Sequence, residues 1–117
     1  MTQRSVTFTS EQIADYAEAS GDRNPIHLDA EFARSVGLPG VIAHGMLQMG
    51  LAAGVAAQAA GGVDRLKRIS VRFAGMVEPG DTVTFSAQPS APGKLELTAT
   101  NQRGEAVLTR ATAEFKP

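Results

Sequence analysis

Asp22 and His27 are two side chains whose types and spacing could do chemistry together. Asn24 and Pro25 lie between them. Pro25 fixes its own φ and has no N–H, and it pushes Asn24 out of the helical region of backbone space. The carboxylate and the imidazole are therefore predicted to lie on a turn rather than on one face of a helix. An acid and a base aimed at one point are what the addition of water to a double bond requires.

The length and composition of the chain limit the class of protein to which it can belong. Its 117 residues are expected to form one domain, residues 1–117, which can bury a core without disulfides. The absence of cysteine from the sequence excludes thiolate nucleophiles and cysteine metal sites. The net charge of -1 argues against a nucleic-acid partner. Met1–Ser5 do not begin a signal peptide, so the sequence predicts a cytoplasmic protein.

The residues before and after the Asp22–His27 turn are predicted to be helical. An alternation around Val6 is typical of a short strand. Thr9, with a glutamine three residues later, fits a capping box and predicts a helix over 10–20. Asp29 is expected to cap a second, short helix. The turn therefore connects two helices.

The middle of the chain, residues 38–63, contains no charged side chain. It is long enough to span a membrane, but it is mostly alanine and glycine, which add little transfer free energy. We therefore expect no membrane partner and instead a helix of a soluble protein over about His44–Ala60, buried on nearly every side. Gly61 and Gly62 are expected to end it.

The last third of the chain alternates apolar and polar residues, as strands do. Four strands are predicted, separated by turns rich in glycine and proline, around residues 69–73, 83–87, 95–99 and 106–115. One apolar face in each is typical of an antiparallel sheet covered on one side. The predicted fold class is α+β, an antiparallel sheet wrapped around one long uncharged helix.

Three segments of the chain resemble a known family. They are Tyr16, the run Ser20-Gly21-Asp22-Arg23-Asn24-Pro25-Ile26-His27, and the run Ala43-His44-Gly45-Met46-Leu47. Together they resemble the MaoC-like branch of the hot-dog fold, the family of (R)-specific enoyl-CoA hydratases. The related (3R)-hydroxyacyl-acyl carrier protein dehydratases are similar too. The Asp-x-Asn-Pro-x-His signature is specific, and the resemblance covers nearly the whole chain.

The resemblance implies roles for four residues. Asp22 and His27 match the catalytic pair, which would hold a water and share general base and general acid duty in an order that stays open. Asn24 matches a position that fixes the turn and the water. Gly45 matches the oxyanion donor. A physical reason supports that role, because N–H groups in the first turn of a helix lack intrahelical partners and lie at the positive end of its dipole.

Other candidates for substrate binding have structural alternatives. Met46 and Met49 are expected in the core or at a dimer interface, and the alternative is that they line an acyl pocket. A basic cluster at 65–72 is most simply a solvated face. The alternative is that Arg68 and Arg72 in this cluster bind the phosphates of coenzyme A or an acidic carrier protein.

His44 is expected to start the central helix rather than to act as a second base. Two histidines could suggest a metal, but the ligands needed beside them are not apparent, so neither a metal nor a cofactor is predicted. Coenzyme A or the carrier protein would be part of the substrate. One departure concerns a serine that bacterial hydratases of the family often carry along this helix. Residues 50–54 have no hydroxyl there, which implies a change in water positioning or in pocket size.

The predicted function is that of an (R)-specific enoyl-CoA hydratase, which adds water syn to trans-2-enoyl thioesters and gives (3R)-hydroxyacyl thioesters. One alternative is the reverse reaction on a carrier protein, in fatty acid or polyketide synthesis. Another is a partner subunit or acyl-binding module without turnover, and the fold alone would also allow a thioesterase. The resemblance implies a homodimer whose sheets join edge to edge, which covers an exposed strand edge. A heterodimer with a related chain stays open, as does acyl chain length.

Overall fold

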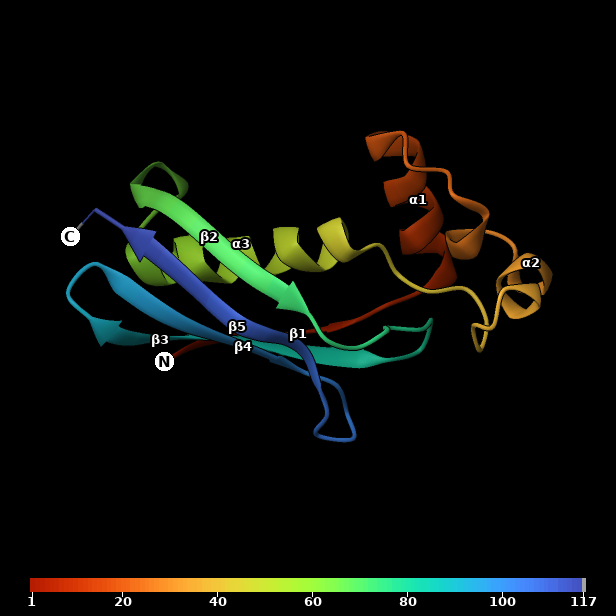
Figure 1. Ribbon diagram of the computed structural model, residues 1–117. Helices are drawn as coiled ribbons and strands as arrows, with labels where there is room; N and C mark the ends of the chain where they lie inside the picture. Colours follow the sequence, from red (N-terminus) through yellow and green to blue (C-terminus); the bar gives the residue numbers. More distant parts are fainter. Residues whose placement is uncertain (117) are drawn as a thin grey trace.

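The computed structural model describes residues 1–116 and shows an α+β fold, with one sheet packed against one long helix (Figure 1). The strands are β1 (Thr2–Thr7), β2 (Leu66–Phe73), β3 (Thr82–Ala91), β4 (Lys94–Thr100) and β5 (Ala106–Phe115). The α-helices are α1 (Ser10–Ser20), α2 (Ala30–Ser35) and α3 (Gly45–Ala60). Pro25–His27 and Val63–Arg65 form single 3₁₀ turns.

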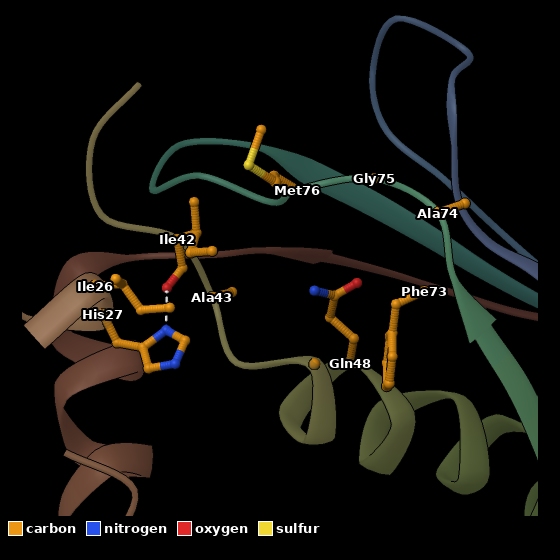
Figure 2. A pocket seen from close by; sticks show the side chains of 10 residues that line it. Ile26, His27, Ile42, Ala43, Gln48, Phe73, Ala74, Gly75 and Met76 are labelled. Atoms are coloured by element: carbon orange, nitrogen blue, oxygen red, sulfur yellow. Dashed lines mark hydrogen bonds between the residues drawn. The ribbon is translucent and has the colours of Figure 1, made fainter. Parts of the chain in front are cut away.

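The five strands form one antiparallel sheet in the order β1-β3-β4-β5-β2. The four strands predicted from alternation are confirmed in the last third of the chain. β2 follows α3 in sequence and takes the edge of the sheet opposite β1, so α3 lies across one face between the two edges. The chain then passes from Phe73 at the end of β2 toward the start of α3 (Figure 2).

The core lies between α3 and the covered face of the sheet. Alternate residues of β3, among them Val83 and Phe85, point inward and are almost fully buried. Val55 and Ala56 of α3 meet them from the other side. The small side chains of the helix let its backbone approach the strands closely. Each large side chain buried here contributes roughly 1.5–3 kcal/mol of hydrophobic stabilisation.

The prediction that α3 is buried on nearly every side is wrong for this chain. Its exposed residues recur at every fourth position, and they are Met46, Gly50, Gly54 and Gln58. Residues four apart share a helix face, so this stripe faces away from the sheet. The absence of charged side chains does not show that every face of a helix is buried. A single sheet covers only one side of the helix, so the opposite side stays exposed. No helix within residues 1–116 is long and apolar enough to cross a membrane.

The predicted caps position the turn that carries Asp22. Thr9 Oγ1 accepts the N–H of Gln12 at 3.0 Å and begins α1. Gly21 ends α1 in the left-handed conformation (φ 80°), which glycine adopts without steric penalty. Asp29 Oδ1 accepts the N–H of Phe32 at 3.1 Å and begins α2. α1 and α2 stand at the end of the sheet where α3 begins (Figure 1).

Candidate active site

The turn between α1 and α2 orients the Asp22 carboxylate. Its Oδ1 accepts the backbone N–H of Asn24 at 3.3 Å. The Asn24 side chain in turn accepts the N–H of Ile26 at 3.1 Å and caps the 3₁₀ turn, with Pro25 at its first position. Asp22 Oδ2 is left facing His27 Nε2 at 4.0 Å. The structure thus brings together the two residues that the sequence singled out, at a separation that one water can bridge.

The hydrogen bonding of His27 fixes which ring nitrogen carries the proton. His27 is buried, and its Nδ1 lies 2.7 Å from the carbonyl oxygen of Ile42. A carbonyl oxygen can only accept, so Nδ1 donates. In the neutral ring the lone pair is therefore on Nε2, the atom that faces Asp22. A nitrogen with a lone pair beside a carboxylate can take a proton from water.

His44 lies behind this pair and ties it to the start of α3. Its ring stacks on His27 with centroids 3.7 Å apart, and the edge of Tyr16 meets it at 4.8 Å. His44 Nε2 donates to the main-chain oxygen of Asp22 at 2.9 Å. His44 is the N-cap residue of α3, as predicted, but its side chain makes no capping bond. Its role is instead to join the turn, the imidazole of His27 and the helix start into one unit.

A cavity of about 520 Å³ opens beside His27 at the start of α3. Its walls are mostly apolar and come from the turn, from α3 and from the segment that follows β2 (Figure 2). Gly45 lines it, and its N–H belongs to the first turn of α3, where N–H groups are unpaired within the helix. A Cβ on Gly45 would lie 3.1 Å from the Phe73 ring. Only glycine leaves room there for the Phe73 ring, which forms part of the cavity wall.

Gln48 and Phe73 line the same cavity, and sequence reasoning did not single them out. Gln48 rises from α3 between His27 and Phe73 (Figure 2). It is 3% exposed, and its Oε1 has no hydrogen-bond partner within the described chain. The signal that could have found it is a strongly polar residue inside the uncharged stretch. Phe73 carries no comparable signal, because it reads as one more apolar residue of a strand.

Comparison with known proteins assigns the chain to a family. Residues 1–111 match the family model described as the MaoC like domain. The chain belongs to the MaoC-like domain family. It is 43% identical over 106 residues to the fatty acid synthase beta subunit aflB of Emericella nidulans, covering 85% of this chain and 5% of that protein. It is 35% identical over 110 residues to a peroxisomal hydratase-dehydrogenase-epimerase of Neurospora crassa, covering 94% of this chain and 12% of that protein.

The R-hydratase PhaJ1 of Pseudomonas aeruginosa has the same hot-dog fold. The two structures superpose with a TM-score of 0.82 at 28% identity, covering 96% of this chain and 76% of that one. The MaoC-like chain therefore spans most of this solved structure but only a small part of the two long relatives named above.

The other substrate-binding candidates of this MaoC-like domain lie outside the cavity. Of residues 1–116, neither methionine of the prediction belongs to the cavity wall: Met46 is 61% exposed and Met49 is half-buried. Met76, which was not predicted, lines the cavity instead. Arg68 and Arg72 are exposed on the edge strand β2. The proposed substrate contacts of these four residues remain predictions.

Asp22, His27 and His44 also form a group that could offer three metal ligands, with one atom from each within 4.8 Å of the others. The stacked rings of the MaoC-like site argue against that use. Their planes are only 22° apart, and each lone pair lies in its own ring plane. The nitrogen lone pairs of two stacked, nearly parallel rings cannot both be directed at one ion. Tetrahedral coordination requires lone pairs that converge on the metal. The arrangement suits proton transfer better than cation binding.

Proposed function

We propose that this chain is an (R)-specific enoyl-CoA hydratase, which adds water to trans-2-enoyl thioesters and forms (3R)-hydroxyacyl thioesters. The observation that carries the proposal is the placement of His27 Nε2, 4.0 Å from Asp22 Oδ2, in the wall of a cavity that also exposes the first turn of α3. Membership of the MaoC-like family and the likeness to an R-hydratase structure support it.

In the proposed reaction Asp22 and His27 hold one water between them. The water oxygen bonds to C3 of the substrate while one of its protons passes to the pair. The electrons of the C2=C3 bond move toward C2 and the thioester oxygen, so that the thioester becomes an enolate with negative charge on that oxygen. The pair then returns a proton to C2, so atoms and charge balance over the cycle. Because oxygen and proton come from one cluster, both add to the same face.

Gly45 would stabilise the enolate. Its N–H lies at the start of a 16-residue helix, where the helix dipole is positive. A preorganised donor aimed at a developing oxyanion typically contributes about 3–4 kcal/mol in a site from which water is excluded. The apolar walls of the cavity favour such exclusion.

A second candidate is the reverse reaction, dehydration of a (3R)-hydroxyacyl group on a carrier protein. The 43% identity to a fatty acid synthase beta subunit favours it. The same site serves both directions, since a catalyst accelerates a reaction and its reverse alike. The exposed basic side chains Arg68 and Arg72 on β2 would suit either the phosphates of coenzyme A or an acidic carrier. In both cases we expect a homodimer, or a heterodimer with a related chain.

The test is hydration of crotonyl-CoA, followed by loss of the conjugated enoyl thioester absorbance. Asp22→Asn and His27→Ala are each expected to lower kcat by about 10²–10⁴-fold. Asp29→Asn is a matched control, because asparagine also caps helices and Asp29 serves only α2. Turnover that survives both site substitutions would overturn the proposal. Activity only with carrier-bound (3R)-hydroxyacyl substrates would favour the second candidate.

A further inference from the structure

Gln48 is a buried polar side chain in an otherwise largely apolar cavity. Its exposed fraction is 3%, and Oε1 is enclosed without a hydrogen-bond partner in residues 1–116. The wall of the same cavity includes Ala43, Gly45 and Phe73. Burying an unpaired amide oxygen is unfavourable, so such groups are rare unless a ligand or another function uses them.

The position of Gln48 on α3 places its carboxamide over the first turn. Residues three apart lie on one face of a helix, so Gln48 shares the face of Gly45. Helical side chains lean toward the N-terminus, which brings the end of a long side chain back over the preceding turn. Both residues line the cavity, and Figure 2 shows the Gln48 carboxamide standing between His27 and Phe73.

We propose that Gln48 is a second oxyanion donor, whose carboxamide N–H binds the thioester oxygen beside the N–H of Gly45 as the enolate forms. This inference rests on the proposed hydratase function and names a catalytic residue of that site. Gly45 and Gln48 line the same cavity, and the Phe73 ring, which fills the space that a side chain at position 45 would take, forms part of its wall.

The carboxamide nitrogen of Gln48 lies on the side of the cavity where His27 stands, and its oxygen lies on the Phe73 side (Figure 2). Within residues 1–116, Gln48 Oε1 makes no hydrogen bond that would fix the orientation of the carboxamide.

The first experiment compares Gln48→Leu with Gln58→Leu in crotonyl-CoA hydration. Gln58 lies on the same helix but on its exposed stripe, so it is a matched control. Gln48→Leu is expected to lower kcat by about 10²–10³-fold with little change in KM, and to leave Tm unchanged or raised. Gln58→Leu should keep wild-type kcat. A Gln48→Leu protein with wild-type kcat, or one that loses kcat only because Tm falls, would overturn the assignment.

Gln48→Glu adds a readout that a structural role would not move. A protonated glutamic acid can donate a hydrogen bond to the thioester oxygen, whereas the carboxylate repels the enolate. The ratio of its kcat to that of the wild type should therefore rise as pH falls. A ratio that stays constant with pH would contradict the proposal.

The decisive measurement does not depend on turnover. In the His27→Ala protein, the carbonyl stretch of bound trans-2-hexenoyl-CoA is recorded by difference Raman spectroscopy, with and without Gln48→Leu. A donor on the thioester oxygen lowers this frequency, so Gln48→Leu should shift it upward. An inactive wild-type protein would reject the hydratase function, while an unchanged carbonyl frequency would reject the role of Gln48 by itself.

Discussion

Two polar clusters in this protein differ in how completely their polar atoms are hydrogen-bonded. The histidine cluster, made of Asp22, His27 and His44, lies at the start of α3. The loop network, made of Asp81, Asn101, Gln102, Arg103 and Glu105, joins the turn before β3 to the β4–β5 hairpin. In the loop network both carboxylate oxygens of Asp81 are bonded, Oδ1 to Gln102 Nε2 at 2.8 Å and Oδ2 to the N–H of Glu78 at 3.0 Å.

The rest of the loop network is equally well paired. Asn101 Oδ1 accepts the N–H groups of Arg103 and Glu105, at 2.9 and 3.0 Å. Asn101 Nδ2 and Arg103 Nε both donate to Glu105 Oε1, at 3.0 and 2.8 Å. Within residues 1–116, every buried polar side-chain atom of the loop network has a hydrogen-bond partner. Such closure is typical of polar groups whose task is to hold two loops together.

The histidine cluster and its neighbour Gln48 leave polar atoms without a hydrogen-bond partner. His44 Nδ1 is buried without a partner in residues 1–116, as is Gln48 Oε1 one turn further along α3. Asp22 Oδ2 and His27 Nε2 face each other at 4.0 Å, too far for a direct hydrogen bond. A third buried atom without a partner, Gln12 Oε1, belongs to α1. The contrast teaches that the fully paired network is built for stability, whereas the unpaired atoms around His27 are available for the proposed chemistry.

The largest expected effect comes from exchanging one oxygen for nitrogen in each cluster. Asp22→Asn should lower kcat by about 10²–10⁴-fold and leave the free energy of unfolding nearly unchanged, because its side chain is 54% exposed. Asp81→Asn should keep turnover but lower the free energy of unfolding by about 1–3 kcal/mol, because an NH₂ group then faces a buried donor. Urea unfolding and crotonyl-CoA hydration measure the two effects. Two variants that lose the same property would break the comparison.

The pH dependence of stability sharpens the same contrast. Burial acts to raise the pKa of Asp81, but the hydrogen bonds from Gln102 and Glu78 and the charge of Arg103 outweigh it and hold the pKa below its ordinary value. Bonds from Asn101 and Arg103 likewise lower the pKa of Glu105. Both carboxylates therefore bind fewer protons in the folded than in the unfolded state below about pH 5.

Their contribution to stability is present above the unfolded pKa, near 4, and is lost as pH falls through the lower folded pKa. The urea midpoint of the wild type is expected to fall between about pH 5 and pH 3. Asp81→Asn should flatten this dependence. Equal slopes for Asp81→Asn and the wild type would show that Asp81 does not contribute to acid stability.

The smallest expected effect concerns glycines of α3. In Gly45→Ala the new Cβ would lie 3.1 Å from the Phe73 ring, which must move and narrow the cavity. We expect kcat to fall on the order of tenfold through substrate misplacement. Gly50→Ala is the matched control, because its Cβ would meet no atom of the described chain within 4 Å. It should keep kcat and raise the free energy of unfolding by up to about 1 kcal/mol. Equal kcat for both variants would show that the space at Gly45 is not needed.

Local patterns predict the fold and the centre of the site well. The alternation of apolar and polar residues in the last third of the chain predicts four of the strands. The capping residues Thr9 and Asp29 predict the starts of α1 and α2. Asp22 and His27 meet because the residues between them allow only a turn, and this constraint is local. The hot-dog fold and the MaoC-like family are confirmed.

The rest of the site depends on contacts that are distant in sequence. The stacking of His44 on His27 requires the start of α3 to return to the turn, and the approach of Phe73 to Gly45 requires β2 to take an edge of the sheet. Neither is encoded in a short window of residues. The exposed stripe on α3 was missed for a related reason, because composition does not reveal which face of a helix the sheet covers.

The stereochemistry of water addition tests the central claim most directly, namely that one cluster delivers both the oxygen and the proton. Crotonyl-CoA is hydrated in D₂O, and the relative configuration at C2 and C3 is determined by NMR together with the absolute configuration at C3. Because Asp22 Oδ2 and His27 Nε2 lie 4.0 Å apart in one cluster, we predict syn addition. The proposed (R)-specific function predicts a (3R) product. Anti addition, or a racemic centre at C3, would contradict the account.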